Sequence, residues 1–244
     1  MSLNVTSNIG VIGYKYSNEL VDGWVAVAKY GYFAYSTDGI NWTEGTISGT
    51  SRGWISVCYG NGKYVAVGYN IDNGYNLISG NDFAYSTDGM NWTEGTISST
   101  SRRWQSVCYG NGKFVAVADI SKYFAYSTDG IHWIEGTISS TNRYWESVCY
   151  GNGIFIAVAS NYYYAYSIDG INWVSGKISS GDRAWQSVCY GNGIFIAVGT
   201  VYYKAICTLS YYQFSGWSQI GNITITDNTV ISGKWIKKDY LPTS

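Results

Sequence analysis

The stretch that decides the fold is WQSVCYGNGKFVAVADISKYFAYSTDGIHW, residues 104–133. It recurs in near copies along the chain, and its opening Trp104 returns as Trp54, Trp145 and Trp185. Its closing phrase, Ser-x-Asp-Gly, recurs around aspartates that are spaced by 50, 41 and 40 residues: Asp38, Asp88, Asp129 and Asp169. A fixed period of this size indicates a repeat architecture in which each repeat is one supersecondary unit.

Each repeat is predicted to form one four-stranded antiparallel sheet. In the third repeat the strand-like stretches are residues 104–109, 113–118, 123–127 and 133–138. Asn111 and Gly112 tolerate the positive φ that a two-residue hairpin turn needs, and we expect Asp129 and Gly130 to close the next hairpin in the same way. The second stretch is apolar on both faces, which fits a strand sandwiched between neighbouring sheets. Four such strands about every 41 residues are typical of a β-propeller blade.

We therefore expect an all-β fold, a single β-propeller domain over residues 1–244 with five blades. The predicted blades span residues 10–48, 49–98, 99–139, 140–179 and 180–221, and residues 222–244 close the ring with residues 1–8. The longer first interval holds an insertion near residues 70–81. In the closing blade, residues 202–217 are expected to form the last two strands. The alternative is six blades, with a reduced, split closing blade built from residues 223–226, residues 230–236 and the N-terminus.

The composition excludes several other classes of protein. Of the 244 residues, 25 are Tyr, 11 are Trp, 30 are Gly and one is Pro, whereas charged residues make up only 13%. Coiled coils and disordered chains have the opposite bias. The net charge of −1 argues against a nucleic-acid partner, which requires clustered basic residues. No run of about 18 apolar residues is present, so no membrane span is expected.

The phrase STDGINW, residues 36–42, resembles the Asp box, or BNR repeat, of sialidases and many other propellers. All four copies keep Ser, Asp, Gly and Trp, but they lack one residue between Asp and Gly compared with the sialidase pattern. The resemblance implies a structural turn between the third and fourth strands, away from any active site. A catalytic or calcium-binding role of the aspartates is the alternative. Size and repeat count are also similar to those of five-bladed tachylectin-type lectins, although the motifs differ.

The residue inventory predicts no catalytic residue, no cofactor and no metal site. The only histidine, His132, replaces an Asn at an exposed turn position. Four of the five cysteines share one strand position, where we expect small buried side chains with free thiols, because equivalent positions one blade apart exceed the roughly 7 Å reach of a disulfide. The cysteines are Cys58, Cys108, Cys149, Cys189 and Cys207. The acids expected on the inter-blade face, Asp119, Glu146 and Asp182, do not form a repeated pair.

The arginines carry the sharpest functional signal. All five lie in loops that join one blade to the next: Arg52, Arg102, Arg103, Arg143 and Arg183. An arginine offers a fixed fork of donors for a sugar or an anion, and an aromatic ring can pack on a sugar face. The predicted ligand-binding residues are Arg52, Trp54, Arg102, Trp104, Gln105, Arg143, Trp145, Glu146, Arg183, Trp185 and Gln186. In the structural alternative, each Trp fills the gap between blades, and each Arg bonds loop carbonyls or pairs with a carboxylate of the adjacent blade, such as Glu44, Glu94 or Glu135.

These features favour a non-enzymatic, lectin-like binding module that recognises a glycan or other small polar ligand at repeated sites on the inter-blade face. A protein–protein interaction scaffold is the second interpretation, and a sialidase-like exo-glycosidase is the third. The first residues lack the basic and apolar regions of a signal peptide. Together with the expected free thiols, this favours the cytoplasm, whereas secretion would need a leader ahead of Met1.

Overall fold

The computed structural model describes residues 23–47, 52–71, 77–78, 82–97, 102–160, 162–177, 184–200, 206–210, 213–214 and 235–236. The regular elements in these ranges are all β-strands. None of the ranges contains a helix long and apolar enough to cross a membrane.

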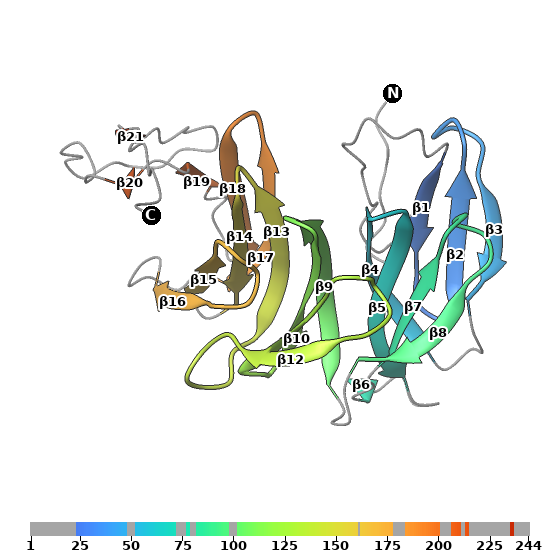
Figure 1. Ribbon diagram of the computed structural model, residues 1–244, viewed down its shortest axis with the longest axis horizontal. Helices are drawn as coiled ribbons and strands as arrows, with labels where there is room; N and C mark the ends of the chain where they lie inside the picture. Colours follow the sequence, from blue (N-terminus) through green and yellow to red (C-terminus); the bar gives the residue numbers. More distant parts are fainter. Residues whose placement is uncertain are drawn as a thin grey trace.

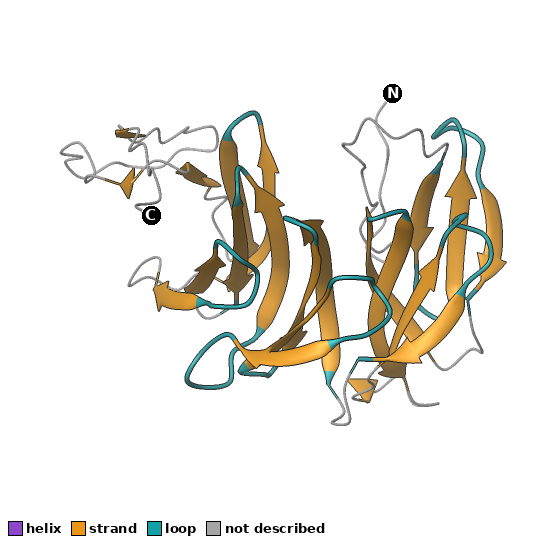
Figure 2. Ribbon diagram, in the orientation of Figure 1, coloured by secondary structure: helices purple, strands orange, loops and turns teal. Residues whose placement is uncertain are grey.

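The strands form antiparallel sheets that follow one another along the chain (Figures 1 and 2). The first sheet contains β1 (Trp24–Val27), β2 (Tyr32–Ser36) and β3 (Thr43–Thr46). The second contains β4 (Arg52–Gly60), β5 (Lys63–Ile71), β7 (Asp82–Ser86) and β8 (Thr93–Thr96), and the short β6 (Leu77–Ile78) pairs with β5. The third contains β9 (Arg103–Gly110), β10 (Lys113–Asp119), β11 (Tyr123–Ser127) and β12 (Ile134–Thr137). The fourth contains β13 (Trp145–Gly151), β14 (Ile154–Ala159), β15 (Tyr163–Ser167) and β16 (Val174–Lys177). The fifth contains β17 (Ala184–Gly191), β18 (Ile194–Thr200) and β19 (Ile206–Ser210), and β20 (Gln213–Phe214) pairs with β21 (Trp235–Ile236).

The sheets are the blades of a β-propeller, which confirms the predicted fold. They fan out side by side, with β4, β9 and β13 on the inner side of the fan and β3, β8, β12 and β16 on its outer side (Figure 1). Each inner strand contacts the inner strand of the next blade. One expectation about the closing blade is wrong: β19 extends the fifth sheet, but β20 pairs with β21 instead of β19. The opening residues 1–22 and most of residues 201–244, on which the choice between five and six blades depends, lie outside the described residues.

The hydrophobic core is divided into layers between adjacent blades. In β10, Phe114 and Ala116 pack against the second blade, whereas Val115 and Val117 pack against the fourth. All four side chains are fully buried. The two-sided apolar pattern of this strand therefore arises because each blade is covered on both faces, as predicted.

The two hairpin connections of each blade are stabilised in different ways. Asn111 and Gly112 both have positive φ, at 45° and 71°, so they form the predicted two-residue turn between β9 and β10. The expectation that Asp129 and Gly130 act in the same way is only partly correct. Gly130 has a positive φ of 75°, whereas the φ of Asp129 is not positive. Asp129 acts instead through its side chain, because β11 and β12 are joined by a longer loop.

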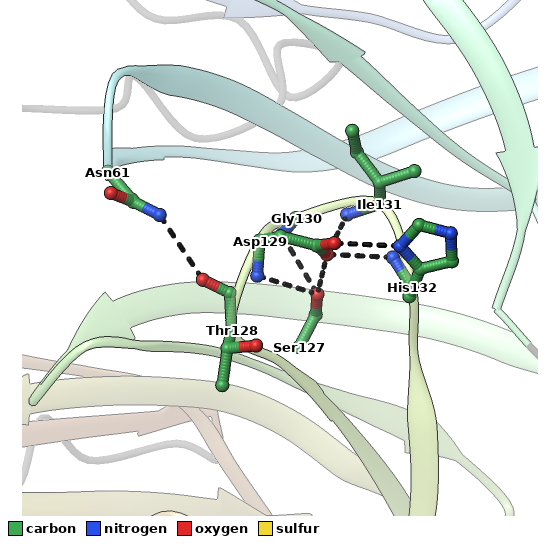
Figure 3. Close-up of polar contacts among 7 residues, drawn as sticks. All are labelled: Asn61, Ser127, Thr128, Asp129, Gly130, Ile131 and His132. Atoms are coloured by element: carbon green, nitrogen blue, oxygen red, sulfur yellow. Dashed lines mark hydrogen bonds and ion pairs between the residues drawn. The ribbon is translucent and has the colours of Figure 1, made fainter.

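The carboxylate of Asp129 organises that loop (Figure 3). Its Oδ1 accepts hydrogen bonds from the backbone amides of Ile131 and His132, both at 2.8 Å, and from the Ser127 hydroxyl at 2.9 Å. The Gly130 amide donates to Ser127 Oγ at 2.8 Å. The same bonds recur around Asp38, Asp88 and Asp169. The Asn41 and Ile40 amides hold the pKa of the Asp38 carboxyl well below its usual range. Each repeated aspartate therefore stabilises its turn through hydrogen bonds between its carboxylate and backbone amides.

The loop that Asp129 organises also ties neighbouring blades together. Asn61, in the β4–β5 turn of the second blade, donates from Nδ2 to the Thr128 carbonyl oxygen of the third blade at 3.2 Å (Figure 3). Asn111 makes the same contact with the Ile168 carbonyl of the fourth blade at 3.3 Å. This end of the blades is therefore fixed by repeated structural contacts, and the opposite end holds the loops that join the blades.

Candidate functional site

The inter-blade face is the end of the blades where the inner strands β4, β9, β13 and β17 begin and the strands β5, β10, β14 and β18 end. Two described residues at the start of a blade pair with the blade before it. The backbone of Arg143, for example, pairs with Ser121, which follows β10 of the third blade. The predicted ligand-binding residues that the structure describes lie at this face. Arg183 and the side chain of Arg52 lie outside the described residues.

The four repeated tryptophans are core residues. Trp54, Trp104, Trp145 and Trp185 are at most 1% exposed. Each ring lies in the apolar layer between its own blade and the preceding one. In this position no ring presents a face to solvent, so the rings act through packing between blades.

Arg102 is held within its own blade. Its Nε donates to Glu135 Oε1 at 2.5 Å, and its guanidinium carbon lies 4.1 Å from the centroid of the Tyr123 ring. The side chain is only 12% exposed. The structural alternative predicts that each arginine bonds loop carbonyls or pairs with a carboxylate of the adjacent blade. Arg102 does pair with a carboxylate, but Glu135 belongs to the same blade as Arg102.

Arg143 has the same stacking but lacks the ion pair. Its guanidinium carbon lies 3.4 Å from the centroid of the Tyr163 ring, which is a close cation–π contact. The position equivalent to Glu135 is Ser175, since Glu135 pairs with Ala125 and Ser175 pairs with Ala165. Arg143 Nε is buried and has no hydrogen-bond partner among the described residues.

A β-bulge follows each repeated tryptophan. In the fourth blade Trp145 pairs with Ala159 and Ser147 pairs with Val158, so Glu146 has no partner in the ladder. Bulges re-aim a side chain and are common next to functional sites. Gln105 occupies the same bulge in the third blade and Gln186 in the fifth. Trp145 is thus buried in the core, whereas Glu146 lies outside the ladder and within electrostatic range of Asp119 and Arg103.

Near Glu146, residues of three blades form a polar cluster. Arg103, the first residue of β9, forms an ion pair from Nη2 to Oδ2 of Asp119, the last residue of β10. Tyr69, from β5 of the second blade, lies within electrostatic reach of Arg103, Asp119 and Glu146. We name Tyr69, Arg103, Gln105, Asp119 and Glu146 the Arg103 cluster. Among its members, Gln105 and Glu146 belong to the predicted ligand-binding set.

Burial perturbs the titration of the Arg103 cluster. Burial, reinforced by repulsion from Asp119 and opposed by Arg103, raises the pKa of Glu146 to about 7. Burial also raises the pKa of Asp119, against the opposing charge of Arg103. Burial raises the pKa of Tyr69 as well. Two carboxyls of raised pKa close to one cation are a frequent feature of functional sites.

Three members of the cluster, Tyr69, Arg103 and Asp119, were not in the predicted ligand-binding set, although Arg103 was among the inter-blade arginines and Asp119 was expected on this face. The signal that could have found them is divergence between the repeats. The inner strands agree from Ser106 to Gly112 in every copy, but Arg103 aligns with Gly53, Tyr144 and Ala184. In the same way, the residues aligned with Asp119 are Tyr69, Ser160 and Thr200. The aligned strands of the repeats therefore differ at positions that belong to the cluster.

The described cysteines are the other reactive side chains of this part of the chain. Cys58, Cys108, Cys149 and Cys189 are free thiols, and burial raises the pKa of the Cys108 thiol well above its usual range. The expectation of buried side chains is wrong for Cys189, which is exposed, and is met only in part for Cys58, Cys108 and Cys149, which are partly buried. Within the described ranges, no three His, Cys, Asp or Glu side chains are grouped so that they could hold a metal ion.

Comparisons with known proteins identify the fold. No family model and no curated protein sequence matches the chain. Among solved structures, a streptogramin B lyase matches with a TM-score of 0.63 at 10% identity, over 78% of this chain and 61% of that one. Virginiamycin B lyase from Staphylococcus aureus matches with a TM-score of 0.62 at 12% identity, over 77% and 66%. YCF48 from Cyanidioschyzon merolae matches with a TM-score of 0.53 at 17% identity, over 82% and 66%.

These structural neighbours share the β-propeller fold with this chain. At such low identity the likeness extends to the fold alone, because one fold hosts many functions. The chain spans between 61% and 66% of the length of these three proteins.

Proposed function

We propose that this propeller is a lectin-like binding module that recognises a glycan or a related polar ligand at the Arg103 cluster on the inter-blade face. The observation that carries the proposal is the divergence of the repeats at the cluster. A position that only packs blades is served by the same residue in every copy, as the buried tryptophans are. Variation at a few positions of otherwise similar repeats favours contact with one particular ligand over packing.

The side chains of the cluster offer the groups that polyhydroxylated ligands require. Arg103 presents further guanidinium donors besides Nη2, which pairs with Asp119. The Glu146 carboxyl accepts or donates near neutral pH, since its pKa is about 7. Arg103 and Asp119 retain 18% and 10% of their side-chain surface exposed. The cluster is therefore desolvated enough for strong polar contacts and still open to a ligand.

A glycan array with the intact protein tests this proposal, with Arg103→Ala and Asp119→Asn as site variants. Glu44→Gln is the matched control, because Glu44 lies exposed on the outer strand β3. We expect both site variants to lose at least about tenfold in affinity for the glycans bound by the native protein, and the control to lose nothing. Absence of any bound glycan, or equal binding by all three variants, would overturn the proposal.

A second candidate function is favoured by the two carboxyls. A general acid that works near pH 7 needs a raised pKa, and Glu146 has one beside Asp119. A glycosidase also uses a pair of carboxyls on either side of the scissile bond. Turnover of a panel of aryl glycosides, abolished by Glu146→Gln, would establish this activity, and a panel without turnover would remove it.

A further inference from the structure

In the fourth blade, two cations adjoin one aromatic ring. The guanidinium carbon of Arg143 lies 3.4 Å from the centroid of the Tyr163 ring, and Lys177 Nζ lies 5.4 Å from the same centroid. Tyr163 begins β15 and pairs with Lys177, which ends β16, so both lie at the inter-blade face. We name Arg143, Tyr163 and Lys177 the Arg143 site. It gathers two positive charges around one ring.

The equivalent place in the third blade has the same kinds of cation and a carboxylate as well. The Tyr123 ring centroid lies 4.1 Å from the guanidinium carbon of Arg102 and 5.3 Å from Lys122 Nζ. Glu135 accepts a hydrogen bond from Arg102 Nε and neutralises that guanidinium. The third blade thus shows which chemical group fits an arginine stacked in this way, namely a carboxylate.

The fourth blade does not supply this carboxylate itself. Ser175, which is exposed, replaces Glu135 on the outer strand. Arg143 forms no ion pair among the described residues, and its buried Nε has no hydrogen-bond partner there. The terminal nitrogens carry the remaining N–H donors of the guanidinium. A partly buried guanidinium beside a second cation, without a counter-charge from its own blade, favours an anion that arrives with a ligand.

We propose that the Arg143 site binds the carboxylate of an acidic sugar, such as a hexuronate, in the place that Glu135 takes in the third blade. This inference rests on the proposed function, since it takes the ligand to be a glycan, and it adds a subsite apart from the Arg103 cluster. The terminal nitrogens of Arg143 donate to the carboxylate, and the flexible Lys177 side chain donates a second charge-assisted hydrogen bond. Methyl esterification of the sugar removes the charge that both cations require.

Galacturonate oligosaccharides test the inference by calorimetry with the intact protein at low salt. One probe is the tetramer of galacturonic acid, and the other is the same tetramer with its carboxyls methyl-esterified. We expect the acid to bind at least about tenfold more tightly than the ester, which is the value of one hydrogen bond to a charged group. Ser175→Glu should abolish most of this preference, because the new carboxylate occupies the place of the ligand. Lys177→Thr should reduce it, and Thr is the natural residue at this place in the first three blades.

Lys122→Thr is the matched control. Lys122 also adjoins a stacked tyrosine, but the arginine on that ring already pairs with Glu135. The control changes the net charge as Lys177→Thr does, and it should keep the preference for the acid. An equal loss of preference in the two lysine variants would assign the effect to net charge and overturn the site.

The other outcomes separate the two proposals. Equal binding of acid and ester, or a preference that persists in Ser175→Glu, overturns the carboxylate site but leaves glycan binding at the Arg103 cluster intact. Tighter binding of tetraglutamate than of the galacturonate tetramer overturns the assignment of the carboxylate to a sugar. Failure of every glycan, acidic or neutral, overturns the proposed function together with the inference.

Discussion

The ring of Tyr150 in the fourth blade lies directly on the backbone of Gly110 in the third blade, so that a Cβ at residue 110 would overlap the ring carbon Cγ. Gly60 and Tyr109 make the same contact between the second and third blades, and Gly151 and Tyr190 make it between the fourth and fifth. The glycine that ends each of the inner strands β4, β9 and β13 is thus required by the close approach of the next blade.

Gly110→Ala should lower the free energy of unfolding by about 1–3 kcal/mol, since the added methyl group forces the Tyr150 ring away from the inner strand. Gly191→Ala is the matched control, because a Cβ at the same repeat position of the fifth blade meets no described atom within 4 Å. Urea denaturation followed by tryptophan fluorescence measures both. Equal stability of the two variants would contradict a steric role of Gly110.

A serine of each of the inner strands β4, β9 and β13 accepts a hydrogen bond from a backbone amide of the next inner strand. The Val148 amide donates to Ser106 Oγ at 3.1 Å, in a buried position. Ser106→Ala should therefore destabilise the protein by about 1–2 kcal/mol and accelerate hydrogen exchange at the Val148 amide. Ser187→Ala, at the exposed equivalent position of the fifth blade, should change neither quantity. An unchanged exchange rate at Val148 would show that the Ser106 hydroxyl is dispensable.

Arg143 offers a site for a stabilising substitution. Its Nε is buried without a partner, whereas Arg102 pairs with Glu135 at the equivalent place. Ser175→Glu should supply the missing carboxylate and raise the free energy of unfolding by about 0.5–1 kcal/mol. The same substitution in an Arg143→Met background should give no gain, and this double-mutant cycle isolates the ion pair. A gain of equal size in both backgrounds would assign the effect to strand propensity.

The sequence predicted the blade more completely than the site, for physical reasons. The strands β9 to β12 lie within one or two residues of the predicted stretches, because period-two patterns and the Asn111-Gly112 turn are local signals. The direction of Trp104 was ambiguous, since a strand that begins at a loop can turn its first side chain either way. The bulge after Trp104 decides this direction, and its register depends on pairing with β10.

The Arg103 cluster was harder to predict, because it depends on packing between blades. Arg103 and Asp119 belong to one hairpin, but Tyr69 and Glu146 come from the blades on either side. Similarity between the repeats drew attention to Arg102 and Arg143, which stack on tyrosines of their own blades. The cluster is indicated instead by a few positions at which otherwise similar repeats carry different residues.

The raised pKa of Glu146 should make the stability of the fold depend on pH. The pKa of this carboxyl rises from 4.5 to about 7 in the folded protein, with burial as the main cause and repulsion from Asp119 as the second. Between these values the folded state binds more protons than the unfolded state, so stability falls as the pH rises from about 4.5 to about 7 and is level above that range.

The substitution Glu146→Gln removes this loss of stability. The variant should match the native protein near pH 4.5 and exceed its free energy of unfolding by about 1–2 kcal/mol at pH 8, a penalty moderated by the water that reaches this half-buried side chain. Urea denaturation at a series of pH values measures the difference, and Glu44→Gln should give a profile parallel to that of the native protein. A parallel profile for Glu146→Gln would mean that Glu146 titrates as an ordinary surface carboxyl.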